Sequence, residues 1–366
     1  MKILILTRSI NNVLGGLERQ INEIASSFGS NGHDVLIVSL DGLSIQSFFE
    51  TRSGNNINWT GLGIGDPARR ATKIEKMKRQ FALYLIVKKF QPDISFSFMI
   101  GAFIYGRIPL LLARKKLVLC ERNSPEIYRL TSARKKRWIY FFIMIFANKI
   151  TIQFERYKSK YPVFLQKKFV VIPNQIVEHV LLNNKDVNSL NFIFAGRFSF
   201  QKQIQKLIIG FSIYKQMGGV GKLILFGDGE QKNDLINLID KLSMSYNIEL
   251  RSAVRDMGEV FSITDVNCLF SKWEGFPNIV AEALKLGIPT FGFKECDGLS
   301  DLIVNNYNGW LIEDNGDPYT ISNKLFEIEK IYDGSFISIK KNCKDSVQKF
   351  DNNLISFEWE SLIKSI

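Results

Sequence analysis

The sequence has few cysteines, and their spacing suits neither a zinc site nor a disulfide framework. The four cysteines, Cys120, Cys268, Cys296 and Cys343, are widely separated and form no C-x-x-C pair. Structural zinc sites and dense disulfide frameworks both use cysteines at closer, recurring spacings. The pattern therefore argues against both and fits a protein of a reducing compartment.

Long hydrophobic runs are missing as well. The longest aliphatic and aromatic run, residues 138–147 (WIYFFIMIFA), has ten residues, whereas a membrane-spanning helix needs about 20. The opening residues, MKILILT, suit a β-strand and lack the longer apolar stretch and cleavage site of a signal peptide. We therefore expect no transmembrane segment and a cytoplasmic location. The 366 residues, 46% of them hydrophobic, are enough for two globular domains.

Positive charge is concentrated in the first half of the chain. Residues 1–175 hold 28 Lys and Arg against 11 Asp and Glu, whereas residues 176–366 hold 20 against 25. This imbalance predicts that the first half meets an anionic partner: nucleic acid, a phosphorylated acceptor or a membrane surface.

One basic cluster, at 134–137 (RKKR), directly precedes the aromatic run at 138–147. Segments of this kind bind anionic lipid with about 1 kcal/mol per cation, so we expect peripheral contact with the inner face of the cytoplasmic membrane. The run also suits a helix buried inside the protein, which is the more ordinary interpretation.

Both halves of the chain alternate strands with helices, which predicts βαβ units and parallel sheets covered by helices. Strands are expected at 2–7, 34–40, 94–98, 117–120, 191–195, 222–226, 248–251, 266–270 and 289–293. Helices are expected at 16–30, 73–90, 204–216, 231–243, 278–286 and 357–366. Residues 41–70, rich in Gly, Ser and Asn, are expected to be irregular.

The fold class that follows is α/β, with two facing Rossmann-like domains and a ligand cleft at the carboxyl ends of their strands. The predicted domains are residues 1–175 and 176–350, with 351–366 as a final helix. The stretch between the Ile-Pro-Asn at 172–174 and the strand at 191–195 is expected to be the linker.

The most informative segment is residues 271–283, SKWEGFPNIVAEA. A strand delivers Glu274 to the carboxyl end of a parallel sheet, and Gly275 and Pro277 shape a tight turn. Asn278 is the expected cap of the next helix. The amides of a helix N-terminus suit a diphosphate, and Glu282 can accept hydrogen bonds from two neighbouring hydroxyls. The alternative, in which both glutamates are solvated surface charges, is less favoured.

Two further sets of residues point to the same chemistry. Arg197 and Lys202 follow the strand 191–195 (AGRFSFQK), so two cations can converge on phosphates. Gly15 and Gly16 follow the first strand, where glycine lets backbone approach a ligand. The turn Gly227-Asp228-Gly229 is interpreted as structural.

These motifs resemble the retaining glycosyltransferases of the GT-B fold, group 4, and in particular the bacterial enzymes that build surface glycans. The similarity runs along most of the chain. It comprises GGLERQINEIA at 15–25, NGHDV at 31–35, ERNSP at 121–125, IPN at 172–174, AGRFSFQKQIQKLI at 195–208, LILFGDGE at 223–230, SKWEGFPNIVAEALKLGIPTFGF at 271–293 and NGWLIE at 308–313.

The resemblance implies transfer of a hexose or N-acetylhexosamine from a nucleotide sugar, expected to be a UDP-sugar. The implied acceptor is polyprenyl-diphosphate-linked or an oligosaccharide of capsule, O-antigen or lipopolysaccharide synthesis. It also implies that the last helix crosses back onto the first domain.

The resemblance assigns roles by position. It implies that Glu274 contacts the donor sugar, that Glu282 holds the ribose, and that Arg197 and Lys202 neutralise the departing diphosphate. Two groups are placed at the nucleotide-sugar site: Gly15 and Gly16, which border the donor phosphates and the acceptor, and Gly275, Phe276 and Asn278.

No Asp-x-Asp motif occurs, so we expect metal independence, with fixed cations stabilising the leaving group, and no cofactor. Many relatives have a histidine near the donor sugar in the first domain. This chain has only His33 and His179, and residues 94–103, where that histidine is expected, contain none.

Three other functions were weighed. A non-hydrolysing sugar-nucleotide epimerase shares the two-domain fold but usually relies on more carboxylates and histidines. An NAD-dependent oxidoreductase lacks support because the first loop has no G-x-G-x-x-G. A binding module or nucleic-acid binder would explain the basic half but leaves the Arg197, Lys202, Glu274 and Glu282 set unexplained, and no nucleic-acid motif occurs.

Overall fold

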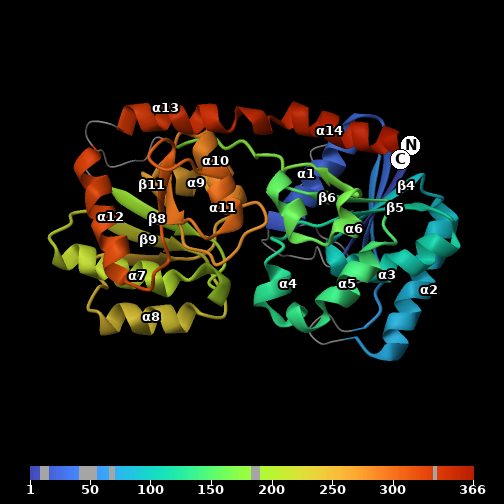
Figure 1. Ribbon diagram of the computed structural model, residues 1–366, viewed down its shortest axis with the longest axis horizontal. Coiled ribbons are helices and arrows are strands. Elements are labelled where there is room, and N and C mark those ends of the chain that lie inside the picture. The colour runs from blue at the N-terminus through green and yellow to red at the C-terminus, as the bar shows by residue number, and fades with distance from the viewer. Residues whose placement is uncertain (9–15, 41–55, 66–70, 183–189, 333–335) are drawn as a thin grey trace. The chain divides into compact units, whose positions relative to one another are not determined.

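The computed structural model describes residues 1–8, 16–40, 56–65, 71–182, 190–332 and 336–366 (Figure 1). These residues form two compact units. Unit 1 consists of Met1–Gln175 and Asn352–Ile366, and unit 2 consists of Ile176–Asp351. Two segments far apart in the sequence therefore build unit 1.

Unit 1 is built on a seven-stranded parallel sheet with the order β3-β2-β1-β4-β5-β6-β7. Residues 3–6 of the central strand β1 are fully buried, as expected for a parallel sheet that helices cover on both faces. The strands are β1 (Lys2–Thr7), β2 (Asp34–Ser39), β3 (Ile57–Gly61), β4 (Ile94–Phe98), β5 (Lys116–Cys120), β6 (Lys149–Ile152) and β7 (Phe169–Val171).

The helices of unit 1 follow the strands in alternation. They are α1 (Gly16–Ser30), α2 (Lys73–Phe90), α3 (Met99–Leu112), α4 (Ile127–Leu130), α5 (Arg137–Met144), α6 (Val163–Gln166) and α14 (Asn352–Ser365), with 3₁₀ turns η1 (Ser132–Lys136) and η2 (Glu155–Lys160). Local sequence sets the ends of α2. Thr72 and Glu75 form a reciprocal capping box, with hydrogen bonds of 3.2 and 2.7 Å, and Gln91 ends the helix in the left-handed conformation (φ 53°).

The core of unit 1 includes the last helix of the chain. The Trp359 side chain of α14 is fully buried. Its ring centroid lies 6.1 Å from that of Phe28 in α1 and 5.5 Å from that of Phe96 in β4, both edge to face. Arg122 covers the same indole, with its guanidinium carbon 5.1 Å from the ring centroid. Helix α14 is therefore a structural part of unit 1.

Unit 2 is built on a six-stranded parallel sheet with the order β10-β9-β8-β11-β12-β13. Its strands are β8 (Asn191–Ala195), β9 (Lys222–Phe226), β10 (Ile248–Arg251), β11 (Val266–Leu269), β12 (Thr290–Phe293) and β13 (Gly309–Ile312). Its helices are η3 (Phe200–Lys202), α7 (Ile204–Gln216), α8 (Lys232–Lys241), α9 (Met257–Ser262), α10 (Asn278–Lys285), α11 (Asp297–Leu302), α12 (Pro318–Ile331), α13 (Phe336–Ser346) and η4 (Gln348–Phe350). Two Rossmann-like parallel sheets with helices confirm the predicted α/β class.

One segment was wrongly predicted to be irregular. Within residues 41–70, of which 41–55 and 66–70 lie outside the described part, residues 57–61 form strand β3. This strand pairs in parallel with β2, with Ile57 opposite Val35. Its sequence, INWTG, combines strand-favouring Ile57, Trp59 and Thr60 with Asn58 and Gly61, which are rare in strands. Pairing along the edge of the sheet, which short-range patterns do not report, decides its conformation.

The aromatic run at 138–147 is not a buried helix, so that interpretation is wrong. Of the residues of α5, only Phe141 and Met144 are buried, while Trp138, Ile139 and Phe142 are about half exposed. A helix of eight residues presents one narrow face to the core. Because nearly every residue of the run at 138–147 is apolar, the side chains that do not fit on that face point outward.

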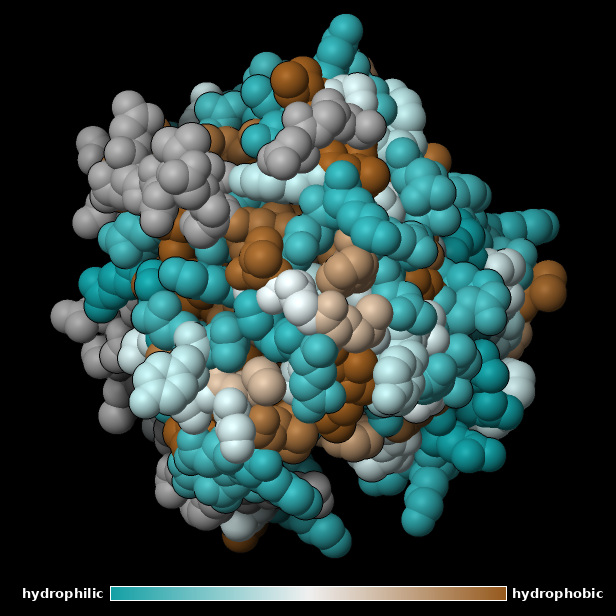
Figure 2. Space-filling view, turned by 90° about the vertical axis from the view of Figure 1, so that its left-hand side faces the viewer, coloured by the Kyte–Doolittle hydropathy of each residue, from teal (hydrophilic) through white to brown (hydrophobic). Residues whose placement is uncertain are grey.

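No helix among the described residues is long and apolar enough to cross a membrane. The surface drawn in Figure 2 is largely hydrophilic, with hydrophobic side chains between the hydrophilic ones.

Trp359→Ala is expected to lower the free energy of unfolding by about 3–5 kcal/mol, because it leaves a cavity against Phe28 and Phe96. Chemical denaturation followed by circular dichroism measures the change. The matched control is Phe357→Ala in the same helix, whose side chain is 71% exposed. An equal effect of the two substitutions would contradict the assignment of α14 to the core.

Candidate functional site

The predicted site residues of unit 2 lie on loops that leave neighbouring strands of the parallel sheet. Strands β8 and β11 pair directly, with Phe192 opposite Val266. The loop after β8 carries Arg197 and Lys202, and the loop after β11 carries Glu274. Because both loops leave the sheet at its carboxyl edge, the two sets of charged residues come together.

Three polar contacts hold these two loops to each other. The Lys272 backbone N–H donates to the carbonyl oxygen of Gln201 at 2.8 Å. The Gln201 side-chain amide donates to the carbonyl oxygen of Trp273 at 2.6 Å. The Lys202 ammonium donates to Glu274 Oε1 at 2.6 Å, and these side chains are only 18% and 12% exposed. The Lys202–Glu274 pair therefore sits in a largely desolvated position, where electrostatic interactions are stronger than at an open surface.

Arg197 differs from Lys202 although both lie in the same loop. Its side chain is exposed and makes no hydrogen bond or ion pair within the described residues. Two roles can therefore be separated at this edge of the sheet. Lys202 is held in place by a carboxylate, and Arg197 offers a guanidinium fork that is open to a ligand.

The turn after β9 shapes the loop that carries Arg197. A Cβ atom at Gly227 would lie 2.0 Å from the carbonyl oxygen of Gly196, and one at Gly229 would lie 2.4 Å from that of Phe198. The Phe198 N–H also donates to the carbonyl oxygen of Asp228 at 2.8 Å. Glycine is needed at both positions because backbone packs directly on backbone.

Helix α10 begins at Asn278, so the prediction that Asn278 caps this helix is wrong. The N-cap is Pro277 (φ −75°, ψ 88°), which has no side-chain acceptor for the first amides of the helix. Proline has no N–H to satisfy, and its fixed φ suits the start of a helix.

Gly275 and Phe276 are buried within the loop after β11. The Phe276 ring packs edge to face on Phe350, with centroids 5.5 Å apart. A Cβ atom at Gly298 of α11 would lie 2.9 Å from the carbonyl oxygen of Gly275 and 3.0 Å from that of Glu274. Close backbone packing on α11 therefore supports the position of this loop, a contact that sequence analysis missed.

Glu282 is buried, and its partner was not predicted. Glu282 Oε2 lies 2.9 Å from His179 Nε2, with side-chain exposures of 2% and 8%. The His179 ring also packs on Phe261, with centroids 5.3 Å apart. His179 was expected to lie in the linker, yet residues 176–182 pack on unit 2, and the Leu182 N–H donates to Ser262 Oγ at 2.6 Å.

The predicted glycines of the first loop belong to unit 1. Gly16 is the first residue of α1 and is exposed. Gly15 lies outside the described residues.

Most of the second unit is similar to a known protein family. Residues 182–344 match the family described as Glycosyl transferases group 1. This segment is therefore similar to the glycosyl transferases of group 1.

Relatives and solved structures agree with this similarity. The chain is 30% identical over 244 residues to an uncharacterized glycosyltransferase of Methanocaldococcus jannaschii, covering 58% of each protein. It is 26% identical over 310 residues to the UDP-Gal:alpha-D-GlcNAc-diphosphoundecaprenol alpha-1,3-galactosyltransferase of Escherichia coli, covering 76% of each. The crystal structure of Anabaena HepE in complex with UDP and glucose superposes with a TM-score of 0.81 at 18% identity, over 100% of both chains. The fold is therefore that of GT-B glycosyltransferases.

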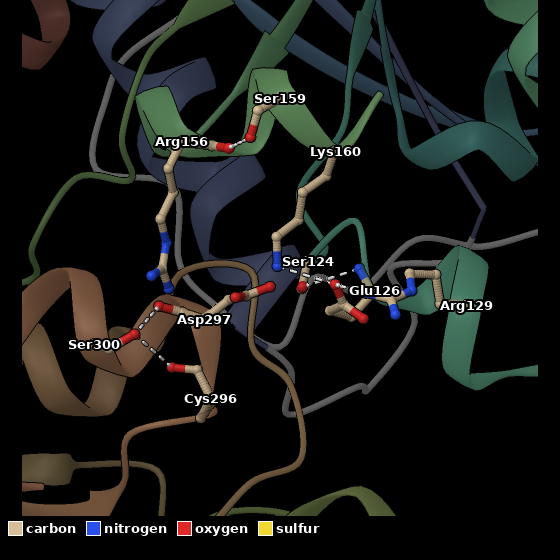
Figure 3. A network of polar contacts seen from close by, with 9 residues as sticks. All are labelled: Ser124, Glu126, Arg129, Arg156, Ser159, Lys160, Cys296, Asp297 and Ser300. Carbon is tan, nitrogen blue, oxygen red and sulfur yellow. Dashed lines mark hydrogen bonds and ion pairs between the residues drawn. The ribbon is translucent and has the colours of Figure 1, made fainter. Parts of the chain in front are cut away.

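Polar contacts beyond the glycosyltransferase loops are drawn in Figure 3. In unit 1, Glu126 accepts hydrogen bonds from Lys160 at 2.9 Å and from Arg129 at 3.2 Å (Figure 3). In unit 2, Ser300 Oγ donates to the carbonyl oxygens of Cys296 and Asp297 at the start of α11. The second set stabilises the helix on which the Glu274 loop packs.

Unit 1 has a buried Glu-Arg pair directly after β5, in the ERNSP motif. Arg122 donates to the carbonyl oxygen of Ile172 at 2.7 Å, to Asn174 Oδ1 at 3.3 Å and to Thr151 Oγ1 at 2.9 Å. One guanidinium therefore joins the ERNSP and IPN motifs of the sequence. Glu121 accepts a hydrogen bond from the Tyr128 hydroxyl at 2.6 Å, and burial raises the pKa of this carboxyl to about 7.

Glu121→Gln is expected to change how stability depends on pH. The folded protein holds a proton on Glu121 that the unfolded chain releases near pH 4.5. The fold therefore loses stability as pH rises from about 4.5 to about 7, by up to about 3 kcal/mol. Thermal unfolding at pH 5 and pH 8 should show a smaller fall for Glu121→Gln than for the unchanged protein. Glu155→Gln, at an exposed ion pair, should follow the unchanged protein, and parallel curves for all three proteins would contradict the buried titration.

From the expectation that Glu282 holds the ribose of a UDP-sugar, Glu282→Gln should weaken UDP binding about tenfold, because a neutral amide makes weaker hydrogen bonds than a carboxylate. Isothermal titration calorimetry measures the affinity, with the exposed Glu259→Gln as the control. A fall in melting temperature with unchanged UDP affinity would mean that Glu282 acts only with His179 in the fold.

Proposed function

We propose that the chain transfers a hexose or N-acetylhexosamine from a UDP-sugar to a lipid-linked or growing glycan acceptor, with retention of anomeric configuration. The observation that carries the proposal is the Lys202–Glu274 pair at the carboxyl edge of the sheet in the segment similar to the glycosyl transferases of group 1. The pair supplies a fixed cation and a carboxylate, and the exposed Arg197 lies in the same loop as Lys202. The donor is inferred from the UDP named for two similar proteins.

In the proposed reaction, the bond between the anomeric carbon and the diphosphate oxygen breaks, and a bond to the acceptor hydroxyl oxygen forms on the same face of the sugar. The acceptor proton passes to the departing diphosphate. Because the breaking bond leaves its electron pair on the diphosphate oxygen, negative charge grows there before the proton arrives, and Arg197 and Lys202 stabilise it without a metal. An ammonium group has three N–H donors, so Lys202 can bind Glu274 and phosphate oxygens together.

The remaining residues bind and orient the donor in this proposal. Glu274 accepts a hydrogen bond from a sugar hydroxyl, and Glu282 accepts hydrogen bonds from the ribose. Gly275 and Asn278 bring the start of α10 close to the diphosphate, while Phe276 supports the loop from behind through Phe350. The proposal keeps the expectation that Gly15 and Gly16 serve the donor phosphates and the acceptor.

The proposed acceptor is a glycan on a polyprenyl diphosphate, used to build a bacterial surface polysaccharide. The Escherichia coli relative is named for a diphosphoundecaprenol acceptor, which is an anchored lipid. A lipid acceptor brings the reaction to a membrane surface, and the basic first half of the chain suits an anionic one. We therefore also propose peripheral association with the inner face of the cytoplasmic membrane.

A panel of UDP- and GDP-sugars, incubated with the protein and a polyprenyl-diphosphate-linked saccharide, tests this function. Release of UDP together with a lengthened lipid-linked product is expected. Formation of an epimeric nucleotide sugar without transfer would instead support an epimerase, and turnover of no donor in the panel would overturn the proposal.

Lys202→Ala is expected to lower kcat about 10²–10³-fold, because one donor to the developing charge on the diphosphate is lost. UDP affinity should fall less than kcat, since the same interaction is weaker before the bond breaks. Steady-state kinetics and calorimetry separate the two effects. Lys241→Ala, an exposed lysine of α8, is the control, and a near-normal kcat for Lys202→Ala would refute the assigned role.

A further inference from the structure

Helix α2 carries apolar side chains on the face that points away from the core. Its buried residues are Arg79, Leu83 and Val87. Four large apolar residues are 51–71% exposed and recur at helical spacing: Ile74, Met77, Phe81 and Leu85. Residues three and four apart lie on one face of a helix, so these four form a continuous outward stripe. A surface helix of a water-soluble protein normally carries polar residues there.

A second set of exposed apolar side chains comes from α5, α6 and the end of α3. Its members are Leu111, Leu112, Trp138, Ile139, Phe142, Ile145, Phe146, Val163 and Phe164, all at least 41% exposed. Phe142 stacks on Phe164 with ring centroids 5.9 Å apart, which joins α5 to α6. These aromatic rings contact each other at the surface rather than a core.

Helix α3 packs against both α2 and α5, the helices that carry most of the two sets. Arg79 of α2 lies over Tyr105 of α3, with 5.9 Å to the ring centroid. Arg107 of α3 lies over Phe146, which follows α5, at 5.5 Å. Within unit 1, α2, α3 and α5 lie next to one another (Figure 1). We call the exposed apolar side chains of α2, α3, α5 and α6, with Ile145 and Phe146 after α5, the apolar face.

Positive charge accompanies the apolar face. The segments 73–90, 99–112, 132–144 and 155–166 contain 14 Lys and Arg against two Glu and no Asp. Next to α5 a pocket of about 350 Å³ is lined by Arg129, Leu130, Arg134 and Arg137. Guanidinium groups around an open pocket suit phosphate oxygens. This charge disfavours a second copy of the chain as the occupant, because two such faces would repel each other.

We propose that the apolar face docks on an anionic phospholipid bilayer. The side chains of α2 and α5 enter the boundary between headgroups and acyl chains, and the arginines of the pocket bind lipid phosphates. Amphipathic helices that carry cations beside an aromatic and aliphatic face bind membranes in this way. Trp138, with Arg137 over its ring at 5.7 Å, has the amphipathic character typical of that boundary.

The docking surface rests on the proposed membrane partner and assigns that partner to residues of unit 1 alone. It requires no spanning helix. The cations of α2 lie on the same helix as the apolar stripe, so their long side chains can reach headgroups while the stripe is immersed.

Sedimentation of the full chain with vesicles tests the docking surface. Binding is expected to vesicles of phosphatidylglycerol and phosphatidylcholine, and to be much weaker with phosphatidylcholine alone or at high salt. The double variant Phe81→Ser, Phe142→Ser should bind anionic vesicles at least tenfold more weakly. Val220→Ser with Ile337→Ser, two exposed apolar residues of unit 2, is the matched control and should bind normally.

A second variant avoids the risk that surface serines disturb folding. Arg134→Ala with Arg137→Ala removes two exposed or half-exposed cations and should weaken anionic binding about 30-fold, from about 1 kcal/mol per cation. Normal vesicle binding by both double variants would overturn the proposal. A stable dimer that the Phe81→Ser, Phe142→Ser variant abolishes would also overturn it, because a second copy of the chain would then cover the apolar face. Loss of vesicle binding on addition of a short DNA duplex at low ratio would overturn it as well, since nucleic acid would then be the preferred partner.

Failure of docking and failure of the proposed reaction can be told apart. UDP release from the donor is measured without vesicles, using a water-soluble acceptor saccharide. Both double variants should keep the unchanged rate in this assay and lose activity only with the acceptor embedded in vesicles. Equal activity of the variants on the embedded acceptor would count against docking and leave the reaction itself intact.

Discussion

The ion pair between Lys202 and Glu274 is the contact on which the arrangement of the site depends. It joins loops that leave two neighbouring strands, and two further hydrogen bonds, one from the Lys272 backbone N–H and one from the Gln201 side-chain amide, fix the same junction. Both side chains are mostly withdrawn from water, so removing either partner leaves the other charge poorly solvated. The position of the cation is thereby set before a ligand binds, and preorganisation of this kind is what makes electrostatic stabilisation effective.

Backbone close packing makes that junction possible. Gly227 and Gly229 let the turn after β9 support the loop with Arg197, and Gly298 lets α11 support the loop with Glu274. None of these glycines carries chemistry, yet each occupies a place where a methyl group would collide with a carbonyl oxygen. The glycines therefore fix the backbone of the loops, and the backbone in turn sets the positions of Arg197, Lys202 and Glu274.

Much of the fold could be predicted because strands and helices follow local patterns. The predicted bounds of β1, α1, α2, β8 and α7 agree with the structure. Features set by distant contacts could not be predicted. Strand β3 depends on pairing with β2, and the exposure of α5 depends on how many of its side chains pack against the rest of unit 1. At the site, charged residue types indicated the loops, but the His179–Glu282 contact joins positions 103 apart and no short motif reports it. The start of α10 at Asn278 was predicted, but its N-cap was not, because Asn278 is a good cap by residue type whereas Pro277 occupies the N-cap position.

The burial of Trp359 has a consequence for the order in which the chain can fold. Unit 2 is inserted between the two segments of unit 1, and Ser27 contacts Ser356 across 329 positions. During synthesis the sheet of unit 1 emerges first, but Phe28 and Phe96 stay uncovered until all of unit 2 has left the ribosome. Contacts of such long range form late, and exposed aromatic surface invites association in the meantime. Early folding of unit 2 would shorten the effective loop between the two segments of unit 1, which must close before α14 can pack. It would therefore limit the time during which Phe28 and Phe96 are exposed.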